Sequence, residues 1–153
     1  MESTEVYSVA ERTVLMQTAA RAIHDNPLVG VGAGNFPWRA SYYLYYANSP
    51  VRGNNVHQVL LSVWADLGFI GLMIFVLAML LGLEAVYQRI RARDGDVVGR
   101  SVLLAGFIAL TIAGLFEHYP YTLLPTQTLW WGMLAIAMQS GGEKQETPQP
   151  VIA

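Results

Sequence analysis

The chain has 153 residues, a formal net charge of -2 and no cysteine. The lack of cysteine excludes disulfide bonds and thiolate metal sites, and the charge gives no electrostatic basis for binding nucleic acid. Hydrophobic residues make up 54% of the chain and charged residues 13%, whereas an average soluble domain has roughly 25% charged residues. Long uncharged stretches lie in the second half, so the composition predicts an all-α, multi-span membrane protein.

Residues 5–25 have the spacing of an amphipathic helix, followed by an irregular loop. The residues that recur on one face are Val6, Val9, Thr13, Met16, Ala20 and Ile23. Asn26-Pro27 predicts the end of this helix, because proline cannot continue it. Glycines, prolines and the aromatic run at 42–46 fill residues 28–55, and such a run is typical of a membrane–water interface. We expect residues 1–55 to form an extracytoplasmic loop.

Three apolar segments predict three membrane helices. The first begins near Val56, after a cap at Asn54 or Asn55, and runs toward Arg91. The expected membrane helices are at about 56–88, 101–116 and 121–138. The tail, 139–153, is rich in Gly, Pro, Glu and Gln, which is typical of a disordered segment.

The arginines between the first two apolar segments predict the orientation. Loop 88–100 contains Arg89, Arg91, Arg93 and Arg100. Since short basic loops stay on the cytoplasmic side, this loop and the tail should be cytoplasmic. Residues 1–58 and the 117–122 turn should then lie outside.

A glycine-rich turn is the first candidate site. Gly30, Gly32 and Gly34 alternate and are followed by Asn35. Such glycines expose backbone N–H groups to an anion, but the spacing fits neither a P-loop nor a dinucleotide-binding turn. The alternative interpretation is a tight turn that ends a helix.

A histidine and two glycines form the second candidate. On one continuous helix, a single stripe would contain His57, Gly68, Gly71, Phe75 and Gly82. We expect another helix to pack closely against this stripe, with His57 at its outer end. The alternative is a solvated interfacial histidine. Asp66 lies on the opposite side of the wheel and is interpreted as a hydrated acid.

Charged residues outside the expected spans give two more candidates. Arginines bind phosphate with two parallel hydrogen bonds, and the outer segment carries Arg12, Arg21, Arg39 and Arg52. The alternative for any one of them is ordinary surface charge. Glu117 and His118 lie between two spans, where they either face the same site or form a polar turn.

Two motifs together resemble the C-terminal region of the O-antigen ligase and polymerase superfamily. The first is Asn-Pro-Leu-Val-Gly-Val-Gly-Ala-Gly-Asn-Phe at 26–36. The second is His57-Gln58, nine residues, and then Gly68-x-x-Gly71, a pattern associated with the ligases. The resemblance covers roughly residues 10–138.

This resemblance implies a multi-pass protein of the bacterial inner membrane with a periplasmic active site and no cofactor or metal. The implied donor is a glycan on undecaprenyl pyrophosphate, and the acceptor is a glycan or lipid. By position, His57 matches the motif histidine near the acceptor, and Arg12 matches a family arginine that binds the pyrophosphate. Full members have further spans upstream, so this chain is expected to be a fragment that is inactive alone.

The histidine signature favours an O-antigen ligase that transfers the glycan to lipid A–core. A polysaccharide polymerase and a protein O-oligosaccharyltransferase of the same superfamily stay open as alternatives. A non-catalytic membrane transport or assembly subunit is the alternative of another class, because glycine stripes and polar span ends occur there too. The sequence does not specify the sugar or the oligomeric state.

Overall fold

The computed structural model describes residues 2–44, 54–93 and 95–139, with side chains from residue 8 onward. These ranges are helical and contain no strand, which confirms the predicted all-α class for them. The helices are α1 (Glu2–Asp25), α2 (Phe36–Tyr43), α3 (Val59–Arg91), α4 (Val97–Gly114), α5 (Tyr119–Thr122) and α6 (Leu124–Met138). The candidate Arg52, part of the aromatic run and the predicted disordered tail lie outside the described residues.

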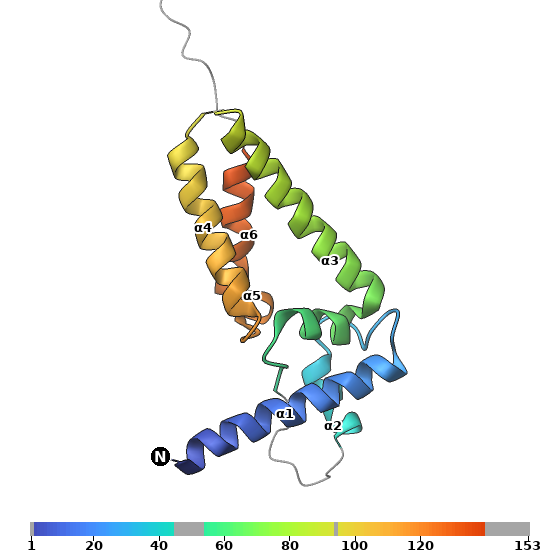
Figure 1. Ribbon diagram of the computed structural model, residues 1–153. Helices are drawn as coiled ribbons and strands as arrows, with labels where there is room; N and C mark the ends of the chain where they lie inside the picture. Colours follow the sequence, from blue (N-terminus) through green and yellow to red (C-terminus); the bar gives the residue numbers. More distant parts are fainter. Residues whose placement is uncertain (1, 45–53, 94, 140–153) are drawn as a thin grey trace, which may run out of the picture.

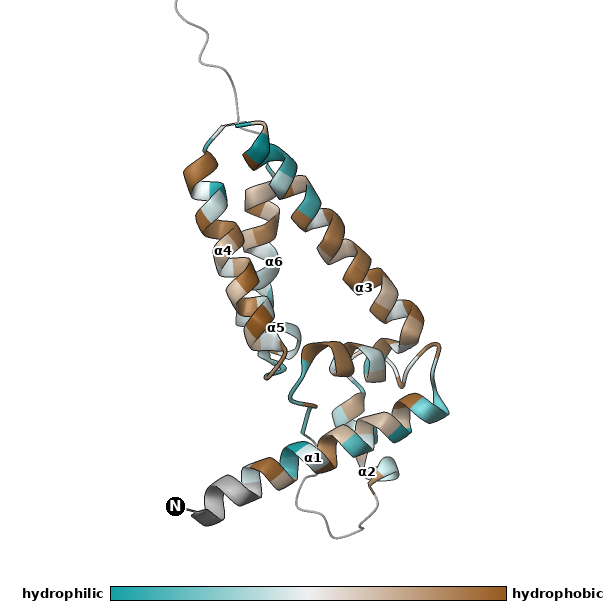
Figure 2. Ribbon diagram, in the orientation of Figure 1, coloured by the Kyte–Doolittle hydropathy of each residue, from teal (hydrophilic) through white to brown (hydrophobic). Residues whose placement is uncertain are grey.

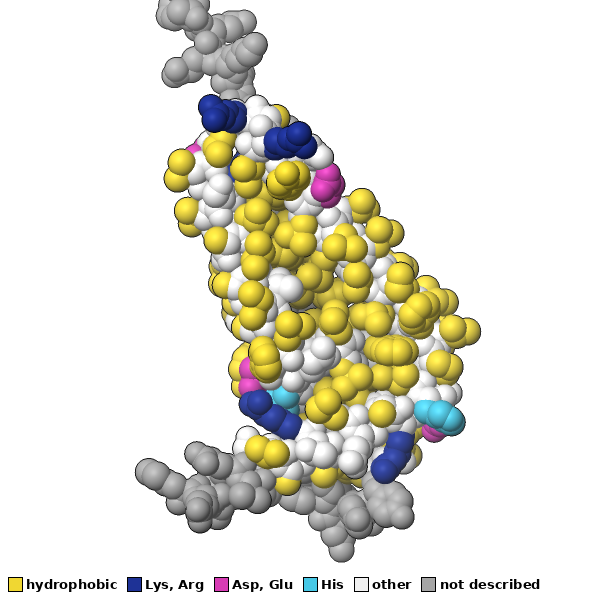
Figure 3. Space-filling view, in the orientation of Figure 1, with side chains coloured by type: hydrophobic (Ala, Val, Ile, Leu, Met, Phe, Trp, Pro, Cys, Tyr) yellow, Lys and Arg dark blue, Asp and Glu magenta, His cyan; other side chains and the backbone are white. Residues whose placement is uncertain are grey.

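The helices form two parts that meet at one end of the molecule. Most of α3 stands beside α4 and α6, while α1 lies across the end of these three helices (Figure 1). Hydrophobic residues dominate the middle of α3 and α4, and hydrophilic residues gather in α1 and in the turn between α3 and α4 (Figure 2). Charged side chains also gather at the two ends of the surface, with Arg and acidic side chains at both and His at the end near α1 (Figure 3).

Two helices in the described ranges are long and apolar enough to cross a membrane, namely α3 and α4. Helix α6 has 15 residues and is therefore roughly 22 Å long, which is short of the roughly 30 Å hydrocarbon core. The third predicted span thus stays a prediction. The two longer helices and their exposed apolar side chains fit a membrane protein.

Aromatic residues pack α6 against α3 and α4. Trp130 is buried, stacks on Phe107 with ring centroids 5.6 Å apart, and lies 5.7 Å from Phe75. Its indole N–H donates to the Thr111 hydroxyl over 2.9 Å, so the one polar atom of the ring is satisfied. This packing holds the middle of α6 in a fixed place beside α3 and α4.

The predicted glycine stripe is wrong, because α3 is not one continuous helix. Gly68 has φ 71° and ψ -175°, so the chain turns sharply there and the positions before it do not share a face with those after it. His57 lies ahead of the helix, whose N-cap is Gln58. Gly82 does allow a close helix contact, since a Cβ there would lie 2.5 Å from Leu134 of α6. A Cβ at Gly71 would meet Leu67 of its own helix instead.

The segment 27–32 fills the break in α3 with backbone hydrogen bonds. In an unbroken helix, the N–H groups of Phe69 and Ile70 would donate to Ala65 and Asp66. Here Phe69 and Ile70 donate to the carbonyls of Pro27 and Leu28, and Val31 and Gly32 donate to those of Ala65 and Asp66, over 2.8–3.2 Å. The loop therefore replaces the helical partners that the break removes. We call residues 27–32 and 65–70 together the α3 junction.

Two glycines make the α3 junction possible. A Cβ on Gly30 would lie 2.4 Å from the Asp66 carbonyl oxygen, and one on Gly68 would lie 2.3 Å from the Leu28 backbone. Both glycines have positive φ, 66° and 71° respectively. Each position thus requires glycine for its conformation and for the close approach of the two backbones.

Asp66 is buried and bonded, which corrects its interpretation as a hydrated acid. Its side chain is among the fully buried ones and the residue is 2% exposed. The carboxylate accepts hydrogen bonds from the backbone N–H of Phe36 over 3.0 Å and from the Tyr121 hydroxyl over 3.3 Å. It therefore binds the N-terminus of α2, where a negative charge is favourable, and links α3 to α5.

The face of α1 that packs inside the chain differs from the expected apolar stripe. Val9 and Met16 of that stripe are 65% and 51% exposed. The buried residues of α1 are Leu15, Thr18, Ala19 and Ala22. Small side chains let α1 lie close to its neighbours, and the Thr18 hydroxyl is satisfied by the carbonyl of Val14. This contact sets the position of Arg12 over the end of the membrane helices.

Candidate functional site

His57 is held between two fixed neighbours at the start of α3. Val56 is fully buried, and its carbonyl accepts a 2.9 Å hydrogen bond from the Ser62 hydroxyl. Gln58 caps α3 by accepting the backbone N–H of Leu61 with its side chain. The His57 side chain is 22% exposed. The imidazole is thus anchored at its backbone but reachable from solvent.

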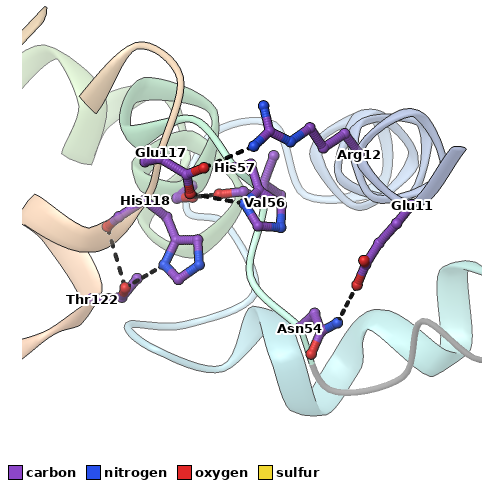
Figure 4. A network of polar contacts seen from close by, with 9 residues as sticks. Glu11, Arg12, Asn54, Val56, His57, Glu117, His118 and Thr122 are labelled. Atoms are coloured by element: carbon purple, nitrogen blue, oxygen red, sulfur yellow. Dashed lines mark hydrogen bonds and ion pairs between the residues drawn. The ribbon is translucent and has the colours of Figure 1, made fainter. Parts of the chain in front are cut away.

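Glu117 brings His57 and Arg12 together (Figure 4). Its Oε2 lies 3.0 Å from His57 Nδ1, and its Oε1 accepts a 2.8 Å hydrogen bond from Arg12 Nη2. The three residues come from the middle of α1, the segment before α3 and the turn after α4. Side-chain exposure is 46% for Arg12 and 28% for Glu117. The structure therefore assembles one polar site from positions far apart in the sequence.

The Glu117–His57 contact determines what the imidazole can do. When Nδ1–H donates to a carboxylate, Nε2 of the neutral ring carries the free lone pair. A carboxylate in this position also stabilises the imidazolium that forms when Nε2 takes a proton. His57 is thus arranged as an acceptor of a proton. Arg12 balances the charge of Glu117 and still has other N–H groups to offer.

His118 lies beside His57. Their ring centroids are 5.2 Å apart, and His118 Nδ1 contacts the hydroxyl of Thr122. Burial lowers the pKa of His118 from its usual value, and the charge of His57 lowers it further, against a smaller opposite effect of Glu117. The ring is therefore biased toward its neutral form. We call Arg12, His57, Glu117 and His118 the His57 cluster.

Three of these residues have the chemistry of a metal site. His57, Glu117 and His118 offer ligand atoms within 4.8 Å of one another, and two imidazoles with a carboxylate suit a divalent transition metal. A metal would compete with Arg12 for the same carboxylate. The resemblance implies a metal-independent reaction, and an experiment that separates the two cases is given below.

The other candidate arginines lie elsewhere. Arg21 of α1 donates to the carbonyl of Tyr43, the last residue of α2, over 3.0 Å. Arg39 is an exposed residue of α2, and Arg52 lies outside the described residues. Among the candidate arginines that the structure describes, Arg12 is the one in contact with Glu117 and, through it, with His57.

The glycine-rich turn binds an anion of the protein itself. The backbone N–H of Phe36 donates to the Asp66 carboxylate over 3.0 Å, and the nearby N–H groups of Gly34 and Asn35 act with it to favour the charged form of this acid, against the larger opposite effect of burial on its pKa. Gly32 leaves room for the Asn35 side chain, since a Cβ there would lie 2.6 Å from Asn35 Nδ2. This favours the structural interpretation of the turn over the phosphate-binding one.

The Asp66–Tyr121 hydrogen bond and the Arg12–Glu117 ion pair were not predicted from the sequence. One signal was available: an acid in an otherwise apolar stretch and a turn with exposed amides both need a partner of the opposite kind. The distance between the acid and the turn could not be deduced from the sequence. Glu117 was expected either to face the site or to form a polar turn, and its two partners could not be deduced from the sequence.

Comparison with known proteins gives one result. A family model described as O-antigen ligase matches residues 3–76, a range that contains α1, the glycine-rich turn, His57 and the α3 junction. Glu117 and His118 lie beyond the matched range. No curated protein and no solved structure matches the chain.

Proposed function

Because this chain belongs to the O-antigen ligase superfamily, we propose that it transfers a glycan from undecaprenyl pyrophosphate to an acceptor hydroxyl at the His57 cluster. Members of this superfamily act on lipid-linked glycans. The observation that supports the proposal most is the contact of Glu117 with both His57 and Arg12. It joins a base to a phosphate-binding group at the end of the membrane helices.

His57 is proposed as the general base. A sugar hydroxyl is a weak nucleophile until a base accepts its proton, and Nε2 of neutral His57 is suited to this role. Glu117 fixes the tautomer through Nδ1 and stabilises the imidazolium as the proton arrives. The acceptor oxygen then forms the new glycosidic bond while the bond to the pyrophosphate breaks.

Arg12 is proposed to bind the departing pyrophosphate. Negative charge grows on that group as the bond breaks, so an arginine stabilises the transition state more than the ground state. The guanidinium is half exposed and uses Nη2 for Glu117, which leaves other N–H groups for phosphate oxygens. Arg21, Arg39 and Arg52 belong to the proposal as further donor-binding residues in the outer segment.

The test is transfer from a lipid-pyrophosphate donor in membranes that contain the protein. His57→Ala should lower the rate about 10²–10⁴-fold, as loss of a general base does. Arg12→Ala should also lower it strongly, and Arg12→Lys should not restore it, because an ammonium lacks the planar two-pronged contact. His24→Ala is the matched control, since the His24 side chain is 88% exposed and contacts only its neighbour Asp25 among the described residues. Near-normal transfer by His57→Ala, at normal protein level, would remove His57 from the mechanism.

The ligase assignment is tested by the acceptor. A ligase loads lipid A–core, a polymerase lengthens a lipid-linked glycan, and a protein O-oligosaccharyltransferase loads a polypeptide. We propose the ligase because of the His57-Gln58 and Gly68-x-x-Gly71 pattern. Unchanged transfer after loss of both His57 and Arg12 would favour a non-catalytic transport or assembly subunit.

We propose that the His57 cluster lies on the periplasmic side of the inner membrane. The last turn of α3 carries Arg89 and Arg91, Arg93 follows directly after it, and Arg100 lies in α4, which favours the cytoplasm for that end. Single cysteines at the exposed positions Gln17 and Ala92 can be probed with an impermeant reagent in intact cells. Labelling at Gln17→Cys alone supports this orientation, and labelling at Ala92→Cys alone reverses it.

A further inference from the structure

A polar pocket opens next to the His57 cluster, on the side of the buried Asp66. It has a volume of about 260 Å³ and is lined by Gly34, Pro37, Asn55, Asp66, Tyr121, Thr122 and Gln127. Pockets for drug-sized molecules measure about 300–1,000 Å³. The Asp66 pocket is therefore sized for a smaller group, such as a single ring.

Some polar groups of the Asp66 pocket make hydrogen bonds within the protein, and others do not. Asp66 and Tyr121 are bonded to each other and are held in place. The side-chain amides of Asn55 and Gln127 make no hydrogen bond to any other residue that the structure describes. Two amides, each with donors and an acceptor, thus line a pocket in which Asp66 and Tyr121 are held in place by their hydrogen bond.

The Asp66 pocket is adjacent to the proposed base. Asn55 is two residues before His57 in the chain. Thr122 contacts His118, whose ring centroid lies 5.2 Å from that of His57. A group bound in the pocket would therefore lie near the His57 cluster, with Thr122 as the lining residue that contacts it.

We propose that the Asp66 pocket binds one sugar ring of a glycan substrate. Neighbouring hydroxyls of a sugar both donate and accept hydrogen bonds, and planar amides such as those of Asn55 and Gln127 match them in both directions. The Tyr121 ring and Pro37 provide apolar surface for the C–H face of the ring. This inference rests on the proposed function and names the substrate group that the site recognises.

Other ligands fit the Asp66 pocket less well. The Asp66 carboxylate forms part of the wall, so a phosphate would meet a like charge. A lipid chain would leave the amides of Asn55 and Gln127 without partners. The pocket between the membrane helices is of the opposite kind, since its lining is almost entirely apolar, from Val59 to Trp130.

The experiment measures transfer kinetics for both substrates in membranes that contain the full protein. Asn55→Ala and Gln127→Ala should each raise the KM of one glycan substrate about 3–10-fold, as the loss of a hydrogen bond does, with a smaller effect on kcat. A rise for the acceptor assigns the pocket to the acceptor sugar, and a rise for the donor assigns it to the donor sugar. Asn54→Ala and Gln88→Ala are matched controls. The Asn54 amide donates a hydrogen bond to Glu11, and the Gln88 amide donates one to Glu84 at the other end of α3.

Two results would overturn the inference. One is an unchanged KM for both substrates in the double variant at normal protein level. The other is competition by inorganic phosphate that is relieved by the same variant. If alanine lowers the protein level, Asn55→Leu and Gln127→Met keep the side-chain size without the amide and replace the alanine variants. Loss of transfer in His57→Ala together with unchanged KM values in the pocket variants would reject the sugar site and leave the proposed function intact.

Discussion

The α3 junction and the His57 cluster lie at the same end of the molecule but are built in opposite ways. At the junction, backbone groups of residues 27–32 and 65–70 pair with each other, and Asp66 is 2% exposed. In the cluster, side chains from three segments meet around Glu117, and each of the ion-paired groups is partly exposed. Both regions include motif residues of the same family match, 3–76.

This difference shows that motif residues of one family can have two kinds of role, one in folding and one in chemistry. Gly30 and Gly68 belong to the motifs because the backbones approach too closely for a Cβ. His57 has no such constraint, and its contact with Glu117 leaves one ring nitrogen available. We therefore expect variants at the junction to lower the amount of folded protein, and variants in the cluster to lower transfer at a normal protein level.

The largest expected effect is that of Gly68→Ala. Its φ and ψ lie in a region that only glycine visits readily, at a cost of about 1–3 kcal/mol for other residues, and the new Cβ would also lie 2.3 Å from the Leu28 backbone. Most folded protein should be lost. Gly34→Ala is the control, because Gly34 also has positive φ but no atom lies within 4 Å of a Cβ there. Protein level and thermal unfolding in detergent compare the two, and equal behaviour would contradict the close approach.

The next effect is that of Glu117→Gln. The amide keeps the shape of the side chain but loses the charge that both His57 and Arg12 use. Loss of the carboxylate from a buried catalytic triad costs about 10⁴ in rate, and this partly exposed site should lose about 10²-fold. The measurement is the transfer rate at normal protein level. Glu84→Gln, at the other end of α3, should transfer at the wild-type rate, and a wild-type rate for Glu117→Gln would separate Glu117 from catalysis.

A smaller effect concerns pH and His118. The folded protein lowers the pKa of His118 by burial and by the charge of His57, so the unfolded chain binds more protons below about pH 6.5. Stability should therefore fall as the pH is lowered through that range and be fully present above it. His118→Asn should reduce the difference in thermal midpoint between pH 7.5 and 5.5, and His24→Asn should not. An unchanged difference in His118→Asn would place the titrating group elsewhere.

The smallest expected effect is that of a chelator. If arginine and histidine carry the reaction, transfer should stay the same after treatment with EDTA. Loss of transfer that added Zn²⁺ restores would show that His57, Glu117 and His118 hold a metal, since their ligand atoms lie within 4.8 Å of one another. That result would move Arg12 away from Glu117 in the working enzyme.

The sequence predicted the long helices well because their signals are local, but the expectation of an irregular loop over 28–55 was wrong at α2, Phe36–Tyr43. Asn26-Pro27 marks the end of α1 within a residue of Asp25, and the apolar run predicts most of α3. The break at Gly68 was not predicted, because a glycine in an apolar stretch is compatible with a continuous helix. Only the hydrogen bonds from residues 27–32 make the break stable, and they are contacts between distant positions.

The candidate site was predicted in part for the same reason. His57 and Arg12 were found through a resemblance, and Glu117 and His118 through their place between two spans. The burial of Asp66 depends on the N-terminus of α2 and on Tyr121, which are 30 and 55 residues away in the chain. The helical spacing of α3 carries no information on partners from other elements, so the sequence alone predicted that Asp66 is hydrated.

The hydrogen bonds between residues 27–32 and 65–70 in the α3 junction have a consequence for how the protein enters the membrane. A helix that breaks near the lipid surface leaves N–H and C=O groups that hydrocarbon cannot solvate, at a cost of several kcal/mol each. The groups that satisfy them belong to residues 27–32, which leave the ribosome before residues 65–70 do. When α3 inserts, its partner segment has thus already been synthesised and can dock without waiting for the rest of the chain.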